Sequence, residues 1–202
     1  MEQPTEFNWP PLESNPEVFT EYLHNIGVPA DWVVGEVFGL DEDCLAFVPK
    51  PVIAVIATFE NLKKGEESKS DAAPAETHYY MRQTHKLDNA CGVIACIHSV
   101  LNNLDKVSLA DGSVLHRFHQ SVKDLSPEER AKSLEDNTEF QETHKQYAAQ
   151  GQSNLAATQD DVRHHFIAFV LNAKGQIVEL DGIKSGPLVV KDQSDDLLKD
   201  AA

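Results

Sequence analysis

The apolar residues of this chain occur either at helical spacing or in short continuous runs. Residues 15–17, Asn-Pro-Glu, combine a helix-capping residue, a proline suited to the first helical position and an acid. Val18, Tyr22 and Ile26 then fall on one face, and Gly27 is suited to end the helix. The pattern predicts a helix over about 16–26.

Four further segments are predicted to be helical from the same kind of pattern. They are residues 41–48, which end before Pro49; the apolar run that follows Cys91; residues 113–122, with Val114, Phe118 and Val122 along one side; and a helix that begins at the capping box of Ser126 and runs to about Phe140.

The remaining apolar segments have the length and composition of strands. Residues 51–59 form a near-continuous apolar run between chain-breaking residues, which predicts a strand buried on both faces. Residues 32–38 and 79–81 are shorter strand candidates. Residues 165–171 and 176–181 are typical of the two strands of a hairpin.

Two segments lack an apolar period. Residues 62–77 are charged, small and proline-bearing, which predicts a solvated loop. Residues 143–161 contain Gln, Ala, Ser and Gly, and structureless stretches of this length are usually functional lids or disordered. With 202 residues and no internal repeat, the chain is expected to form one domain, residues 1–202.

Acidic residues outnumber basic ones by 33 to 17, which gives a formal net charge of −16. This charge argues against nucleic-acid binding, which needs a basic face. It suits a basic partner through electrostatic steering, or a surface that only keeps the protein soluble. No apolar run reaches the roughly 20 residues of a membrane span, and the first residues lack the features of a signal peptide. We therefore expect no membrane contact. Three cysteines without a C-x-x-C pair indicate reduced thiols, which predicts a cytoplasmic location.

Cys91 is the residue with the most informative chemistry. It follows Asn89, a residue type that caps helices, and precedes the apolar run 93–97, so its thiol is expected in the first turn of a helix. The positive end of the helix dipole stabilises a thiolate, which is a nucleophile. His165, 74 residues further on, and Asp181, 16 beyond it, can activate and orient that thiol. The chain is therefore predicted to be a cysteine hydrolase.

The predicted hairpin tests this arrangement. If residues 173–175 form a three-residue loop with a left-handed glycine, counting back along the strands places Ile167 opposite Asp181. His165 then lies on the same face as Asp181, diagonally across and about 7–8 Å away at the backbone. A two- or four-residue loop would put the two on opposite faces. The register favours His165 over His164.

Each of these residues also has a simpler structural role open to it. Cys91 can be a small buried hydrophobe, His165 a hydrogen-bonded strand residue and Asp181 a turn former before Gly182. Nine histidines offer many accidental pairs. His164 beside His165 suggests a metal, but no cysteine or carboxylate set completes a site, so no metal or other cofactor is expected.

Several strings of the sequence resemble those of the ubiquitin C-terminal hydrolases, which are small papain-like cysteine proteases. The strings are MRQTHKLDNACGVIACIHSVLNN (81–103), HFIAFV (165–170) and ELDG (179–182), with weaker matches at 11–19, 48–55 and 125–135. The resemblance covers nearly the whole chain and looks closest to the short cytosolic members. It implies an α+β, two-lobed fold with a central, mostly antiparallel sheet flanked by helices. It also implies a crossover loop over the cleft at about 143–161.

The resemblance also implies the roles of three residues. Cys91 matches the nucleophile, His165 the general base and proton donor, and Asp181 the acid that orients the imidazole. The implied reaction is the hydrolysis of small adducts or peptide extensions from the C-terminal glycine of ubiquitin by a monomer. Two alternatives remain: a hydrolase of a related ubiquitin-like modifier, and a ubiquitin-binding protein with impaired turnover. The retention of all three residues favours the enzyme.

Two features depart from the family pattern. The family's oxyanion glutamine stands six residues before the cysteine, where this chain has His85, whereas Gln83 stands eight before Cys91. Gln83 can still donate its amide to the oxyanion if the two extra residues bulge outward. The family also continues beyond the sequence that matches residues 197–200 with the rest of a helix and a final strand, so a C-terminal strand is expected to be missing.

Overall fold

The computed structural model describes residues 7–60, 73–150 and 164–201. The described elements, in chain order, are α1 (Pro16–Ile26), α2 (Glu42–Ala46), β1 (Ala54–Glu60), the 3-10 helix η1 (His85–Leu87), α3 (Cys91–Leu101), α4 (Val114–Val122), α5 (Pro127–Glu135), α6 (Thr138–Ala148), β2 (His164–Leu171), β3 (Ile177–Leu180), β4 (Leu188–Lys191) and α7 (Leu197–Ala201).

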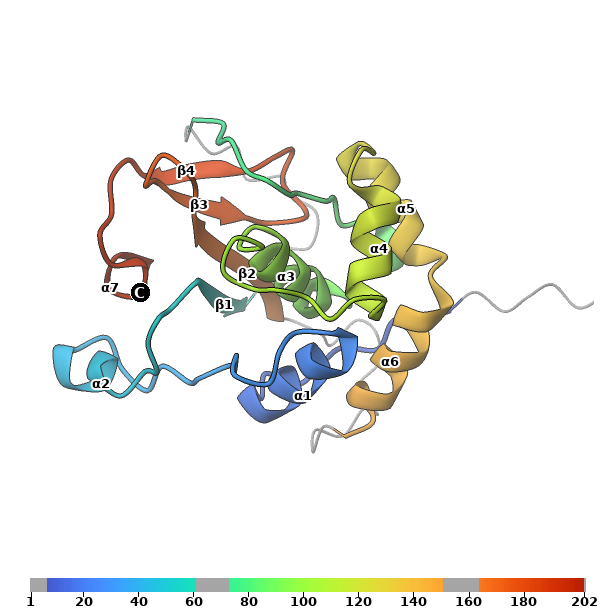
Figure 1. Cartoon of the computed structure of the whole chain (residues 1–202), viewed down its shortest axis with the longest axis horizontal. Helices are drawn as coiled ribbons and strands as arrows, with labels where there is room; N and C mark the ends of the chain where they lie inside the picture. Colours follow the sequence, from blue (N-terminus) through green and yellow to red (C-terminus); the bar gives the residue numbers. More distant parts are fainter. Residues whose placement is uncertain (1–6, 61–72, 151–163, 202) are drawn as a thin grey trace, which may run out of the picture.

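The four described strands form one antiparallel sheet in the order β1-β2-β3-β4. Helix α3 packs against β2 and β1, while α1 packs against α6 and α4 against α5. In Figure 1 the strands lie on the left, α4, α5 and α6 on the right, and α3 between them. The fold is therefore α+β, with a sheet lobe and a helical lobe, as predicted.

Helix α3 is the centre of the hydrophobic core. All of its residues from Cys91 to Leu101 are buried, so it has no solvent-facing side. A helix that is apolar all round is stable only when other elements cover every face. Here the sheet covers one side, and residues from α1, α4, α5 and α6 belong to the same buried cluster.

Most predicted helix boundaries are confirmed by their caps. The Asn15 side chain accepts the backbone N–H groups of Glu17 and Val18. Ser113 and Ser126 cap α4 and α5 in the same way. The sequence therefore places these helix starts correctly, because each depends on a local hydrogen bond between neighbouring residues.

The prediction of one helix from Ser126 to about Phe140 is wrong. Asn137 adopts an extended conformation and its side chain accepts the Phe140 N–H at 3.0 Å, which starts a second helix. That helix, α6, continues to Ala148, so the beginning of the predicted loop 143–161 is helical. Residues 151–161 of that loop lie outside the described residues, as do residues 62–72 of the predicted loop 62–77.

Two of the predicted strands differ from the structure. The strand predicted at 51–59 is observed as β1, but it is half-buried rather than buried on both faces, because it is an edge of the described sheet. The prediction of a strand at 32–38 is wrong: the segment has no regular secondary structure and pairs with no described strand. Instead, Val34 from this segment and Val55 from β1 help to line a cavity of about 310 Å³.

The segment 79–81 is not a strand either, because side chains take the place of a neighbouring strand. Asn102 accepts the Tyr79 N–H at 3.0 Å and donates to the Tyr79 carbonyl at 2.8 Å. The Tyr80 carbonyl accepts Arg130 Nη1 at 2.8 Å. The Met81 N–H donates to the ring of His98. Side chains of α3 and α5 thus satisfy buried backbone that no ladder reaches.

Replacing Asn102 with alanine is expected to lower the free energy of unfolding by about 2–6 kcal/mol, because a buried N–H and a buried C=O lose their partners at about 1–3 kcal/mol each. Urea denaturation at neutral pH measures the loss. Gln120→Ala is the control, since that amide is exposed on α4 and should change stability by less than about 0.5 kcal/mol. Equal effects of the two substitutions would contradict this account of the segment.

Candidate active site

Cys91 is the first residue of α3 and is only 5% exposed to solvent. The residue at the N-cap position is Ala90 rather than the predicted Asn89, and it makes no side-chain cap bond. The N–H groups of the first helical turn have no partner within the helix. An uncapped helix start beside the thiol therefore leaves donors and a positive dipole end for an anion.

The hairpin brings His165 and Asp181 together as predicted. Ala168 pairs with Leu180, so one step further along the ladder Ile167 stands opposite Asp181. His165 Nε2 lies 2.7 Å from Asp181 Oδ1, and the two side chains are only 12% and 7% exposed. The neighbouring His164 is exposed and makes no such contact among the described residues. The three-residue loop and its register are confirmed.

The contact with Asp181 identifies which ring nitrogen of His165 carries a proton. A carboxylate only accepts, so Nε2 carries a proton and Nδ1 is left for Cys91. Burial alone would lower the pKa of His165, but hydrogen bonds with Asp181 and Cys91 outweigh burial and raise its pKa to about 9. The imidazole is thus protonated at neutral pH.

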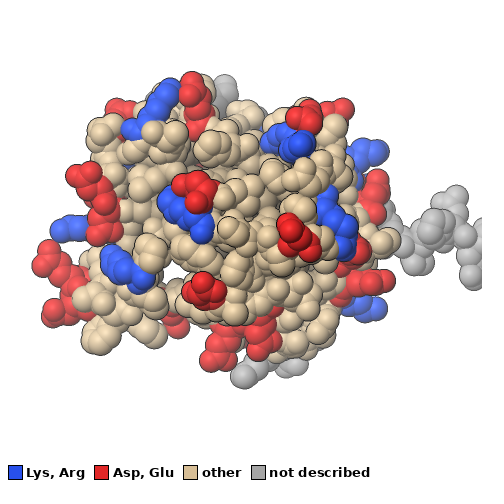
Figure 2. All heavy atoms as spheres, in the orientation of Figure 1, with Lys and Arg blue, Asp and Glu red and all other residues tan. Residues whose placement is uncertain are grey.

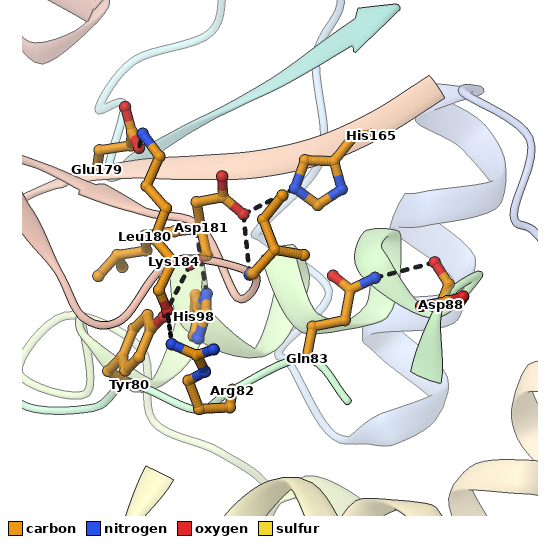
Figure 3. Close-up of polar contacts among 11 residues, drawn as sticks. Tyr80, Arg82, Gln83, Asp88, His98, His165, Glu179, Leu180, Asp181 and Lys184 are labelled. Carbon is orange, nitrogen blue, oxygen red and sulfur yellow. Dashed lines mark hydrogen bonds and ion pairs between the residues drawn. The ribbon is translucent and has the colours of Figure 1, made fainter. Parts of the chain in front are cut away.

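Asp181 is held by its own turn as well as by His165. Its Oδ1 accepts the Ile183 N–H at 3.1 Å, so the simpler turn-forming role is also present. Its backbone carbonyl accepts the Tyr80 hydroxyl at 2.8 Å. The carbonyl of Lys184, at the end of this turn, faces both that hydroxyl at 2.6 Å and Arg82 Nη1 (Figure 3).

These supporting residues were not identified from the sequence. Tyr80 and Arg82 donate hydrogen bonds to backbone carbonyls about a hundred positions away. Every residue has a backbone carbonyl, so the sequence does not indicate which one will be the partner. Only their proximity to Gln83 in the string that resembles the family pointed to this region.

Gln83 lies in the site despite the two extra residues of its loop. Residues 85–87 form the short helix η1, with the His85 side chain 96% exposed and Leu87 buried. The loop therefore bulges outward. Gln83 Nε2 donates to the Asp88 carbonyl at 2.9 Å, and its amide lies between His165 and Asp88 in Figure 3. Among the described residues, its buried Oε1 has no partner.

Gly182 allows the segment that carries Gln83 to approach the Asp181 turn closely. The Gln83 N–H donates to the Gly182 carbonyl at 2.8 Å. A Cβ at position 182 would lie 2.9 Å from the Cβ of Gln83, which is closer than real Cβ contacts. The glycine of the string ELDG is thus required by a tertiary contact rather than by its own turn.

The described residues show no other type of site. In that part of the chain, no three His, Cys, Asp or Glu side chains are placed to hold a metal ion. None of the described helices combines the length and apolar composition needed to cross a membrane.

A thiol at the start of a central helix, beside an imidazole–carboxylate pair from a sheet, is the arrangement that a cysteine hydrolase requires. The chain matches the family described as "Ubiquitin carboxyl-terminal hydrolase, family 1" over residues 9–202. It is 44% identical over 205 residues to a ubiquitin carboxyl-terminal hydrolase of Drosophila melanogaster, with 96% of this chain and 87% of the relative covered. It is 40% identical over 201 residues to ubiquitin carboxyl-terminal hydrolase isozyme L1 of Homo sapiens, with 95% and 87% covered.

Solved structures show the same relationship. The fold is similar to that of the Trichinella spiralis UCH37 catalytic domain bound to ubiquitin vinyl methyl ester, with a TM-score of 0.75 and 27% identity over 96% of this chain and 84% of that one. The chain therefore belongs to the ubiquitin carboxyl-terminal hydrolase family, and the prediction of a cysteine-type hydrolase is confirmed.

The raised pKa of His165 predicts how stability depends on pH. A group whose pKa rises from 6.5 to about 9 on folding stabilises the native state below pH 6.5, and this contribution is lost as pH rises toward 9. Wild type should therefore lose stability relative to His165→Gln over this window, by about 1–3 kcal/mol. Urea denaturation of both proteins at pH 6, 7.5 and 9 measures the difference. A difference that does not change with pH would refute the assignment.

Proposed function

We propose that this protein, as a monomer with one catalytic domain, cleaves small adducts or peptide extensions from the C-terminal glycine of ubiquitin. Cys91 is the nucleophile, His165 the general base and acid, and Asp181 the residue that orients the imidazole. The observation that carries the proposal is the 2.7 Å contact of His165 with Asp181, together with the hydrogen bond between His165 and the Cys91 thiol at the start of α3.

The first chemical step forms a thioester. Cys91 Sγ, as the thiolate, attacks the carbonyl carbon of the glycine, and the carbonyl oxygen becomes an oxyanion. The imidazolium of His165 then gives its Nδ1 proton to the leaving amine while the carbon–nitrogen bond breaks. The buried Asp181 holds Nε2 and stabilises the positive ring before this transfer.

The second step releases the modifier. His165, now neutral, takes a proton from a water molecule that attacks the thioester carbonyl. The carbon–sulfur bond breaks and leaves the thiolate beside the newly protonated imidazole, while the carboxylic acid formed on ubiquitin loses its remaining proton to solvent.

Two sets of donors are available for the oxyanion. The first-turn N–H groups of α3 point toward the start of the helix, where the thiol lies. The Gln83 amide nitrogen has two hydrogens, of which one is engaged by the Asp88 carbonyl. That contact orients the amide and leaves its second hydrogen for the substrate.

The choice of ubiquitin rests on two observations. Two structures of Trichinella spiralis UCH37 contain bound ubiquitin vinyl methyl ester, and this chain has a similar fold. The net charge of −16 favours a substrate with a basic tail, and Figure 2 shows acidic side chains along the lower margin of a face on which acidic and basic side chains are otherwise mixed.

Incubation with ubiquitin vinyl methyl ester should label wild type covalently, because the electrophile reaches the position of the scissile carbonyl. Cys91→Ala should not be labelled, whereas Cys96→Ala, a substitution at a second buried cysteine of α3, should be labelled like wild type. Intact-mass spectrometry measures the adduct. His165→Ala should lower turnover on the order of 10⁴-fold.

The same experiment separates the alternatives. Binding of ubiquitin without any labelling would indicate a binding protein with impaired turnover. Faster labelling by a probe made from a ubiquitin-like modifier would show that this modifier, and not ubiquitin, is the preferred substrate. Labelling of His165→Ala at the wild-type rate would remove the base assignment.

Gln83→Ala is expected to lower kcat on the order of 10²–10³-fold with little change in KM, because the amide stabilises charge that develops only in the transition state. Gln141→Ala is the matched control. That amide also donates to a backbone carbonyl, of Glu135, but lies on α6. Steady-state hydrolysis of a fluorogenic ubiquitin C-terminal amide measures both. A Gln83→Ala enzyme with wild-type kcat would show that the helix donors suffice.

A further inference from the structure

His98 is a buried residue of the nucleophile helix, two turns after Cys91. Its Nε2 accepts the Met81 N–H at 3.1 Å, and its Nδ1 lies 3.3 Å from the Leu180 carbonyl. An N–H only donates and a carbonyl only accepts, so the ring must be neutral with its proton on Nδ1. Burial lowers the pKa of His98 to about 4, which agrees with a neutral ring.

Both partners of His98 belong to segments that carry proposed site residues. Met81 stands two residues before Gln83, on the same extended segment. Leu180 ends β3 and immediately precedes Asp181. One side chain of α3 therefore joins the helix to both segments.

Tyr80 completes this connection from the other side. Its ring stacks on the ring of His98, with centroids 5.3 Å apart and planes at 13°. Its hydroxyl lies within hydrogen-bond distance of the Asp181 and Lys184 carbonyls. The two charged side chains that act on His98, Asp181 and Arg130, shift its pKa in opposite directions and less than burial does.

We propose that His98 is a positioning residue for the reaction. Its two hydrogen bonds hold the Asp181 turn and the Gln83 segment against the nucleophile helix, and so set where the imidazole and the amide stand relative to the thiol. This inference rests on the proposed function, because His98 positions residues whose roles, those of Cys91, Asp181 and Gln83, are part of that proposal.

His144 offers a matched control, because it is equally buried but serves another part of the core. Its Nε2 donates to the Pro10 carbonyl, and its ring packs on Trp9 with centroids 4.9 Å apart. A residue that only stabilises the fold should behave like His144 when it is replaced.

The first measurement compares leucine and glutamine at position 98. In hydrolysis of a fluorogenic ubiquitin C-terminal amide, His98→Leu should lower kcat about 10–100-fold and leave KM within about 3-fold, since misplacement by an ångström costs on the order of 10²-fold. His98→Gln carries one donor and one acceptor and should restore most of that loss. His144→Leu should keep the wild-type kcat. Equal kcat losses in the two leucine variants would overturn the proposal.

The second measurement needs no ubiquitin. NMR titration of the His165 ring should give a pKa of about 9 in wild type and in His144→Leu, and a pKa lowered toward 6.5 in His98→Leu, because Asp181 is no longer held in place. If His98→Leu does not fold, His98→Met, a flexible apolar side chain that also makes neither hydrogen bond, is expected to shift the His165 pKa in the same direction. A His165 pKa that stays near 9 in these variants would overturn the inference. A wild type that shows no hydrolysis, with a lowered pKa in His98→Leu, would reject the proposed function alone.

Discussion

The complete burial of α3 is the constraint on which the rest of the structure depends. A helix without a solvent-facing side needs neighbours all round, so the sheet and the other helices are arranged about it. Its polar side chains cannot reach water and must find partners inside the protein. The side chain of His98 binds the backbone of the segment before Cys91, and so does that of Asn102, the C-cap residue of the helix. Burial of one helix thus explains both the core and the path of the chain beside it.

The same constraint places the candidate site where the two lobes meet. Cys91 starts the central helix, while His165 and Asp181 belong to the sheet lobe, and β2 packs directly on α3. The distance between thiol and imidazole is therefore set by core packing, which is stiff, rather than by a loop. Low exposure also strengthens the contact between His165 and Asp181 and lets it outweigh the cost of burying a charged ring.

Much of the site was predictable because it depends on short-range rules. The hairpin register, which brings His165 to Asp181, follows from counting residues around a three-residue loop. Capping residues marked most helix starts for a similar reason. The failures share the opposite cause. Segments 32–38 and 79–81 have the composition of strands, but whether a strand forms depends on a partner elsewhere in the chain, and neither segment has one among the described strands.

The sequence by itself determined the helix that begins at Cys91, the hairpin that brings His165 to Asp181, and the family to which the chain belongs. Only the tertiary structure decided how Gln83 reaches the site: η1 bulges outward, Gly182 permits close approach, and the Asp88 carbonyl orients the amide. It also decided that His98 joins both site segments to the helix. The physical reason is that these contacts involve backbone groups. Every residue has the same backbone groups, so the residue types in the sequence do not indicate which of them will come together on folding.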